Sequence, residues 1–504
     1  MKRRIPIYLL VAMVLSMCVS ACNDDSDDPG DVIDPARNAV MITSFNLQKN
    51  DSILSNLDSV YFSIDLDRAV VFNADSLPKG TRVNRLQLNI GLSTVKKAEI
   101  TMPGSKGQDT VVNYLTNSTD SIDFSRGSVK LHLESASGDV TRDYTIFVNV
   151  HKMDPDKMAW GDLQGDKLPT SLSNAVAQRT VEFGKEIICF TQQGSSFCRA
   201  ITSNPDNASW SKSSVTLPAG AKLSTLTAGA TKLFVTDAAD KLYESADKGI
   251  TWTATGASMT YIYGCIADKA IGNLKGASGY TYVTYPASTT SAVSADAPVE
   301  LTSQALTYTT EWSENPMLIV SGGKTAAGRI VGGTWAYDGT QWANITLNSL
   351  PALQAPAVVP YFAYKTSAAW RVTKQSVLLA FGGLLSDGTD NKKTYISYDM
   401  GVHWTVASDL MQLPATIAVG RQADAIVFTQ RKTATPSARW NEIAAMQLPV
   451  WYEVQSQAAG RAVAPVTEWD CPYIYVFGGV NASDALNKNI WRGVINRLTF
   501  KPLQ

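Results

Sequence analysis

Carboxylates offer the widest choice of chemistry in this sequence. Two acids at a suitable distance are enough to hydrolyse a glycosidic bond or to hold calcium, and sequence alone does not show that distance. Asp247, Asp338 and Asp399 are weaker candidates, because each stands at an expected structural turn. Other acids, such as Asp237, Asp268, Glu311 and Glu468, are not ranked by the sequence.

Other ligands for metals are sparse. The chain of 504 residues contains 3 histidines and 6 cysteines, and no Cys-x-x-Cys or Cys/His cluster suggests zinc. We therefore expect no metal site and no cofactor. With a formal net charge of −1, the chain lacks the excess of positive charge that is typical of nucleic-acid-binding proteins.

Two cysteines have the spacing of a cross-strand disulfide in an exported protein. If Gln193 and Gly194 form a two-residue hairpin turn, Cys189 and Cys198 face each other. Free thiols are the alternative, because Gln-Gly is a poor turn and Cys189 lies in an apolar run that suits burial. Cys265 is expected to be a buried free thiol, and so is Cys471.

Cys22 has the chemistry that its sequence context defines best. Basic residues 2–4 precede an apolar stretch at residues 5–19, which is too short to span a bilayer and is typical of a signal peptide. Val-Ser-Ala before Cys22 resembles the lipobox read by the lipoprotein signal peptidase, in which the cysteine thiol receives a diacylglyceryl group. Residues 1–22 are therefore predicted to be a lipoprotein signal peptide with Cys22 as the lipid attachment site. An ordinary secretory signal is the alternative.

Residues 23–37 are expected to form an acidic tether. The run Asn-Asp-Asp-Ser-Asp-Asp is followed by Pro29 and Gly30, and such a segment cannot bury a core. It resembles the export signal of Bacteroidetes surface lipoproteins, which implies an outer-membrane lipoprotein exposed at the cell surface. A plain spacer is the alternative. No later apolar stretch reaches about 18 residues, so membrane contact is expected only through the lipid anchor.

Residues 38–152 are predicted to form a β-sandwich. Apolar residues alternate with other residues in several runs, such as Leu86 to Leu92 and Val129 to Leu133, and Pro/Gly/Ser turns separate these runs. About seven such strands fit an immunoglobulin-like domain. His132 lies on the face opposite Leu131, so a solvent-side or cross-strand polar role is expected for it.

Internal repeats predict a β-propeller for residues 158–504. Two eight-residue segments match the Asp-box pattern Ser-x-Asp-x-Gly-x-Thr-Trp, the second with His403 in place of threonine. Each is expected to be a hairpin turn in which aspartate accepts hydrogen bonds, glycine takes an unusual backbone angle and tryptophan packs. The fixed positions are Ser245, Asp247, Gly249 and Trp252, then Ser397, Asp399, Gly401 and Trp404.

A second repeat is an apolar strand that ends in Gly-Gly. It occurs at residues 318–323, 378–383 and 474–479, each preceded by a tryptophan, and it resembles the kelch repeat. Tryptophans followed by Leu-Pro recur as well. Taken as marks of successive blades, with Tyr285 standing in for one missing mark, the tryptophans predict seven blades. Six blades with one long insertion are the alternative.

The enzymes that these repeats resemble need residues that this chain lacks. Sialidases carry Asp boxes but also need an arginine triad, and the only Arg-Ile-Pro lies in the predicted signal peptide. Galactose oxidase is a propeller built from kelch repeats, but its copper ion needs histidine ligands. His403 is the only histidine after residue 151 in this chain. We therefore expect a binding protein rather than an enzyme, with a glycoside hydrolase or lyase as the alternative.

The propeller is expected to bind a glycan or a surface protein through exposed aromatic side chains. Five tyrosines cluster around its least regular part, although strand packing is the alternative role for each. They are Tyr261, Tyr263, Tyr280, Tyr282 and Tyr285.

The whole arrangement resembles a group of Bacteroidetes surface lipoproteins with an immunoglobulin-like domain before a kelch/Asp-box β-propeller. That resemblance implies an all-β chain with a role in cell adhesion or nutrient capture.

Overall fold

A computed structural model describes residues 35–73, 75–104, 107–206, 209–286, 290–310, 313–366, 372–433 and 468–498. Cys22, Glu311 and Trp440 lie outside these residues, as does almost all of the predicted tether. The chain divides into two compact units. The first is built from residues up to 48 together with 64–71 and 84–146, and the second from 49–63, 72–83 and 147–504.

Strands account for nearly all of the regular structure in the described residues. Short 3-10 turns supplement them at η1 (Pro35–Asn38), η2 (Leu57–Ser59), η4 (Leu223–Thr225), η5 (Asp409–Met411) and η6 (Asn496–Leu498). No helix in this part of the chain is long and apolar enough to cross a membrane.

The strands before residue 150 form two sheets, as the alternation of apolar residues predicts. The smaller sheet pairs β1 (Ile42–Leu47) with β4 (Leu88–Leu92). The larger sheet has the order β2 (Phe62–Asp65), β3 (Val70–Asn73), β8 (Thr141–Phe147), β7 (Val129–Ser135), β5 (Val95–Met102), β6 (Thr110–Asn113). Alternate residues of β7 are buried, which gives the sheet one core face. His132 lies on the other face and bonds Asp143 of β8 across the strands, at 2.7 Å between Nδ1 and Oδ1.

Six sheets follow in the second unit, numbered here in chain order. The first is β10 (Ala177–Phe183), β11 (Glu186–Gln193), β12 (Ser196–Thr202), β13 (Ser211–Val215). The second is β14 (Thr227–Ala228), β15 (Leu233–Thr236), β16 (Lys241–Ser245), β17 (Thr253–Ser258). The third is β18 (Tyr261–Ile266), β19 (Lys269–Gly276), β20 (Gly279–Tyr285), β21 (Ser291–Ala292).

The later sheets are longer. The fourth is β22 (Pro298–Glu300), β24 (Ser313–Thr325), β25 (Ile330–Tyr337), β26 (Trp342–Asn344), with β23 (Leu306–Thr310) also paired to β24. The fifth is β28 (Ala357–Thr366), β29 (Val372–Phe381), β31 (Tyr395–Ser397), β32 (Thr405–Val406), beside the small pair β27 (Leu353–Gln354) and β30 (Leu384–Leu385). The sixth is β33 (Asp424–Thr433), β34 (Glu468–Phe477), β35 (Asn489–Ile495), β9 (Met158–Lys167).

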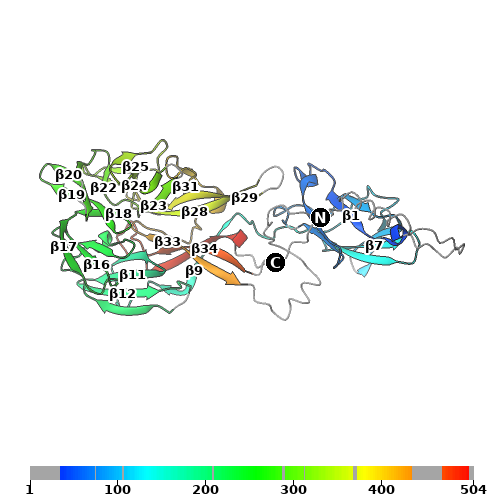
Figure 1. The fold of residues 1–504 in the computed structure, drawn as a ribbon, viewed down its shortest axis with the longest axis horizontal. Coiled ribbons are helices and arrows are strands. Elements are labelled where there is room, and N and C mark those ends of the chain that lie inside the picture. The colour runs from blue at the N-terminus through cyan, green and yellow to red at the C-terminus, as the bar shows by residue number, and fades with distance from the viewer. Residues whose placement is uncertain are drawn as a thin grey trace, which may run out of the picture. The chain divides into compact units, whose positions relative to one another are not determined.

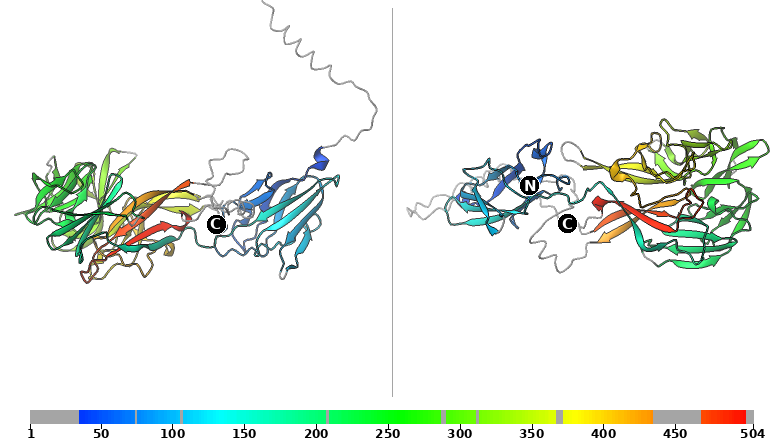
Figure 2. Two further views of the ribbon diagram at one scale, coloured as in Figure 1. Left: turned by 90° about the horizontal axis from the view of Figure 1, so that it is seen from below. Right: turned by 180° about the vertical axis from the view of Figure 1, so that it is seen from behind.

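These sheets close into a propeller ring. The first strand of each sheet neighbours that of the next, with β23 in this place in the fourth sheet, and β33 neighbours β10. Strand β9 comes from the start of the unit and completes the sheet made by its last three strands (Figure 1). In Figure 2 (right), the colours run round the ring from teal to red. The teal start and the red end of the unit meet where β9 pairs with β35. Six clusters of buried apolar side chains fill the six contacts between neighbouring sheets, so the ring is held mainly by packing.

The expected count of seven blades is wrong for the described residues, which form six sheets. Five tryptophans stand in, or directly before, the last strand of a sheet: Trp160, Trp210, Trp252, Trp342 and Trp404. The third sheet has no tryptophan at its last strand, which explains why one mark is missing from the series of tryptophans. The predicted count is too high because it gives Trp440, which lies outside the described residues, a blade of its own, whereas the described strands after β32 form a single sheet together with β9.

The Gly-Gly pairs sit where one sheet meets the next. Each follows the second strand or lies near its end, and all six glycines have positive φ. A Cβ on Gly478 would come within 2.4 Å of Gln178 in the first sheet, and a Cβ on Gly382 within 2.5 Å of Val419, just before the sixth. Glycine is therefore needed for this close approach.

Of the two alternatives for Cys189 and Cys198, the structure has the free thiols and not the disulfide. Cys189 faces Ala200 and Cys198 faces Thr191, because the turn is Gly194-Ser195, one residue later than expected. Gly194 at the first turn position has φ 58°, which glycine tolerates. Cys189 is a fully buried core side chain, and this burial raises the pKa of its thiol to about 12.

Candidate functional site

The first Asp-box segment forms a tightly bonded turn between β16 and β17. Asp247 Oδ1 accepts from the backbone N–H groups of Ile250 and Thr251 at 3.0 and 2.9 Å, and Oδ2 accepts from the Thr251 hydroxyl at 2.6 Å. Ser245 Oγ donates to Asp247 Oδ1 at 2.8 Å and accepts from the Gly249 N–H at 2.9 Å. One carboxylate thus organises the whole turn.

The second segment forms the same turn between β31 and β32. Ser397 Oγ donates to Asp399 Oδ1 at 2.9 Å and accepts from the Gly401 N–H at 2.8 Å. His403 takes the place of threonine: its backbone N–H bonds Asp399 Oδ1 at 2.9 Å, and its ring Nδ1 lies 2.6 Å from Asp399 Oδ2. The imidazole therefore preserves the hydrogen bond that a hydroxyl makes in the first turn.

Both turns pack on the preceding sheet. A Cβ on Gly249 would lie 2.6 Å from Phe190 of β11, and one on Gly401 would lie 2.8 Å from Thr334 of β25. Trp404 is buried and donates from Nε1 to Thr334 Oγ1 at 3.0 Å. The turns are rigid parts of the contact between sheets.

The first turn should make stability depend on pH at the acid end. Burial raises the pKa of Asp247, but hydrogen bonds from Thr251, Ser245 and Ile250 outweigh burial and lower it to about 2. The ionised form favours the folded state, so its contribution is full above about pH 4 and is lost as the pH falls through about 2. We expect Asp247→Asn to cost about 1–2 kcal/mol at pH 5, allowing for partial exposure, and much less at pH 2. Urea unfolding at both pH values measures this; an unchanged cost at pH 2 would contradict it.

The five tyrosines expected to bind a ligand do not form an exposed site. Tyr263 and Tyr282 are buried between the third and fourth sheets, where both contact Trp342 at ring-centroid distances of 4.9 and 5.3 Å. Tyr261 packs edge-on against Tyr263. Tyr285 contacts Phe234 of the second sheet. Tyr280 is partly exposed beside Lys275. Strand packing accounts for most of this cluster.

Several exposed apolar side chains lie on the second Asp-box turn or on the segments bonded to it. In residues 154–503, five large hydrophobic side chains are exposed among those described: Val176, Ile250, Leu347, Tyr398 and Val406. Tyr398 belongs to the turn, Val406 ends the strand that follows it, and Leu347 bonds the turn; with His403, these residues make up what we call the Tyr398 surface. Leu347 is 78% exposed and Tyr398 is 53% exposed. The Leu347 N–H bonds the carbonyl of Val402, which joins the two chain segments at 2.9 Å.

The two turns differ where they face solvent. Tyr398 corresponds to Ala246 of the first turn, and His403 corresponds to Thr251. Serine accepts from the glycine N–H, and aspartate accepts from residue 251 or 403, in both turns, so this difference changes the surface and leaves the main bonds of the turn unchanged. The sequence contained a signal for Tyr398, namely an aromatic residue at a variable position of a turn, where no core contact requires it.

A buried ion pair joins the first and sixth sheets. Arg179 of β10 donates from Nη1 to Asp424 Oδ1 at 2.8 Å, and Asp424 Oδ2 accepts from the Thr180 N–H at 2.5 Å. Asp424 is fully buried. Gln178 also donates to the Phe477 carbonyl, at 3.2 Å. This network lies where the ring closes, so we assign it to ring closure.

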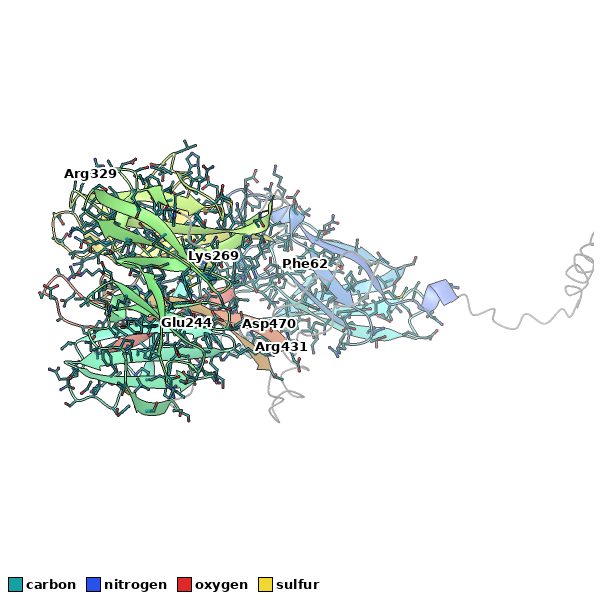
Figure 3. All side chains as sticks on the ribbon, turned by 60° about the vertical axis from the view of Figure 1, so that its left-hand side comes forward. Phe62, Glu244, Lys269, Arg329, Arg431 and Asp470 are labelled. Atoms are coloured by element: carbon teal, nitrogen blue, oxygen red, sulfur yellow. The ribbon has the colours of Figure 1, made fainter. Side chains whose placement is uncertain are left out.

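The remaining acids stabilise local structure. Asp237 accepts from the N–H groups of Ala239 and Lys241, and Asp268 from those of Thr231 and Lys232. Burial raises the pKa of each, but these hydrogen bonds lower it overall. Glu468 pairs with the Arg431 guanidinium at 3.1 Å. Asp470 lies 3.0 Å from the same guanidinium, and Figure 3 labels this arginine and aspartate. Within the described residues, no group of three or more His, Cys, Asp or Glu side chains could hold a metal ion.

Comparison with protein families gives a match for the N-terminal sheets and another for the propeller ring. Residues 154–503 match the DUF6242 beta propeller domain, and residues 40–148 match the DUF6242 N-terminal domain, a domain of unknown function. The chain belongs to the DUF6242 family. Its propeller ring and its N-terminal sheets are thus the two domains of one family. None of the curated proteins compared with this DUF6242 chain matches it.

Solved structures similar to this DUF6242 chain include two auxiliary nutrient binding proteins. The one from Bacteroides ovatus ATCC 8483 is 8% identical, with a TM-score of 0.36, over 83% of this chain and 95% of that one. The one from Bacteroides thetaiotaomicron VPI-5482 is 11% identical, with a TM-score of 0.34, over 91% of this chain and 98% of that one. TM-scores this low carry no argument about the ligand of the DUF6242 propeller.

Proposed function

We propose that this chain is an outer-membrane lipoprotein, exposed at the cell surface, whose six-sheet propeller binds a glycan or a protein through the Tyr398 surface. Its anchor is a lipid on Cys22. The N-terminal domain, which we interpret as an immunoglobulin-like sandwich, serves as a spacer. The observation that carries the binding role is the exposure of Tyr398 on a turn that Ser397 and Asp399 hold by hydrogen bonds, with Leu347 and Val406 exposed on the adjoining segments.

The chemistry of this surface suits a sugar ring or an apolar protein side chain. A tyrosine ring offers an apolar face with a polar end, and such side chains are common at binding surfaces. The bond from His403 Nδ1 to Asp399 holds the imidazole in place and leaves Nε2 to donate or accept toward a ligand. Because the turn is rigid, little conformational entropy is lost when a ligand binds.

The first turn supplies a test that should leave the fold intact. Tyr398→Ala with His403→Thr gives these two positions of the second turn the residues of the first, where Thr251 makes the bond to the aspartate that His403 makes here. The unmodified chain is screened against a glycan array and host matrix proteins. We expect the double variant to weaken the binding found there by about tenfold or more, about 1.4 kcal/mol.

Ile250→Ala is the matched control, because Ile250 is equally exposed on the first turn. We expect binding by this variant to be unchanged. Equal binding by the double variant and the unmodified chain would refute the Tyr398 surface as the site. Turnover of a glycan without stable binding would favour the glycoside hydrolase or lyase instead.

A further inference from the structure

An open pocket of about 440 Å³ lies in the N-terminal unit. It is bounded by the end of β4, the chain that leads into β5, and the chain that leaves β6. None of its lining side chains is charged: they are Ile90, Leu92, Ser93, Thr94, Val95, Tyr114, Leu115 and Ser118. The pocket is therefore lined by apolar and hydroxyl-bearing side chains, and it belongs to the first unit, whereas the residues that we propose for ligand binding by the propeller belong to the second.

One wall of the pocket is the free edge of β4. In the described residues β4 pairs only with β1. The Gln48 N–H bonds the Gln87 carbonyl at 2.9 Å, and the Ser93 N–H bonds the Met41 carbonyl at 2.9 Å, so residues 87 and 93 direct these groups toward β1. Because backbone groups alternate along a strand, the N–H and C=O of Ile90 and of Leu92 point away from β1.

Some backbone groups along this edge already have hydrogen-bond partners. Leu86 exchanges two hydrogen bonds with Ile122, at 3.0 and 2.8 Å. The Ile90 N–H donates to the Tyr114 hydroxyl at 2.8 Å, and that hydroxyl also donates to the Leu88 carbonyl at 3.4 Å. The groups that remain are the N–H of Leu88, the carbonyl of Ile90 and both backbone groups of Leu92, for which the described residues provide no partner. Ile90 and Leu92 line the pocket.

We propose that this edge binds an extended peptide segment of a partner protein, which adds to β4 as a short strand. The segment donates one N–H to the Ile90 carbonyl and exchanges bonds with Leu92, while one of its side chains enters the pocket. Main-chain hydrogen bonds with a pocket for alternate side chains are the usual elements of strand addition. Since the lining is uncharged, the inward side chains of the segment are apolar or carry hydroxyl groups.

A peptide fits these observations better than a sugar does. Tyr114 is the one aromatic residue in the lining, and its ring is buried with its hydroxyl already bonded. It offers no face for stacking. An extended backbone instead supplies donors and acceptors in the alternating order that Ile90 and Leu92 require.

The free edge of β6 is less suitable for strand addition. Only four residues long, β6 is largely exposed, and Val111 at its centre is 54% exposed. No part of β6 lines the pocket. This strand therefore supplies a matched control position.

The test uses the purified chain and an array of nine-residue peptides in which apolar and polar residues alternate. A second set carries lysine or aspartate at the apolar positions. We expect binding by members of the first set only. Leu115→Lys, at a pocket residue that is 47% exposed, should weaken that binding about tenfold or more, and Val111→Lys should leave it within about twofold.

Hydrogen exchange then tests the main-chain contact. The Leu92 amide should exchange more slowly in the peptide complex than in the free chain, because it becomes a donor to the added strand. Three outcomes overturn the proposal: no array peptide binds, a bound peptide leaves exchange at Leu92 unchanged, or Val111→Lys weakens binding as much as Leu115→Lys. None of these outcomes bears on the Tyr398 surface, so the two proposals fail separately.

Discussion

Asp424→Ala is expected to lower the free energy of unfolding by about 3–5 kcal/mol. The carboxylate is fully buried and bonds both the Arg179 guanidinium and the Thr180 N–H. Without it, the Arg179 guanidinium keeps only its bond to the Leu226 carbonyl and loses its ion-pair partner, and the Thr180 N–H loses its acceptor, so both carry a desolvation cost. Urea unfolding followed by circular dichroism measures the change.

The contact between β10 and β33 makes this position sensitive, because it joins the two ends of the ring. Asp484→Ala is the control, since Asp484 also pairs with an arginine, Arg421, but is 77% exposed. An exposed pair is worth less than about 1 kcal/mol. If both variants lose the same stability, the Arg179–Asp424 pair is not an important contact of ring closure.

Trp404→Ala is expected to cost a similar amount, about 3–5 kcal/mol. The indole is buried in the apolar cluster between the fourth and fifth sheets, against neighbours that include Leu350 and Leu378. Its loss leaves a large cavity in a packed contact and removes the bond to Thr334. Denaturant unfolding measures the loss.

Two further variants separate the contributions to this effect. Thr334→Val keeps the volume but leaves the Trp404 N–H without its acceptor, which should cost about 1–3 kcal/mol. Val406→Ala, two residues along the chain from Trp404 on the exposed side, should change stability by less than about 0.5 kcal/mol. A cost for Trp404→Ala no larger than that of Thr334→Val would mean that packing contributes little here.

Local sequence predicted much of the fold. Alternation of apolar residues predicted strands, since a strand with one buried face must alternate, and β7 does so. Ser, Asp and Gly at fixed spacing predicted both Asp-box turns, because every hydrogen bond that the carboxylate accepts comes from within five residues of it. The family match to a propeller is in line with the repeats.

Contacts between distant residues decided the rest. The described strands after β32 form one sheet rather than two, and no local pattern shows that β9, from the start of the unit, completes it. The turn at Gly194 shifted the register of β11 and β12, which separated the two cysteines. The same kind of contact placed Tyr263 and Tyr282 against Trp342 of the next sheet rather than in solvent.

The sequence by itself therefore determined the strands, the turns and the propeller repeats, because these depend on backbone preferences and hydrogen bonds within a few residues. It also contained the lipobox-like segment before Cys22. Only the tertiary structure decided which aromatic side chains are exposed, how the ring closes through Arg179 and Asp424, and which edge of β4 stays open. Burial and pairing of this kind are set by residues tens to hundreds of positions away, and a local pattern carries no information about them.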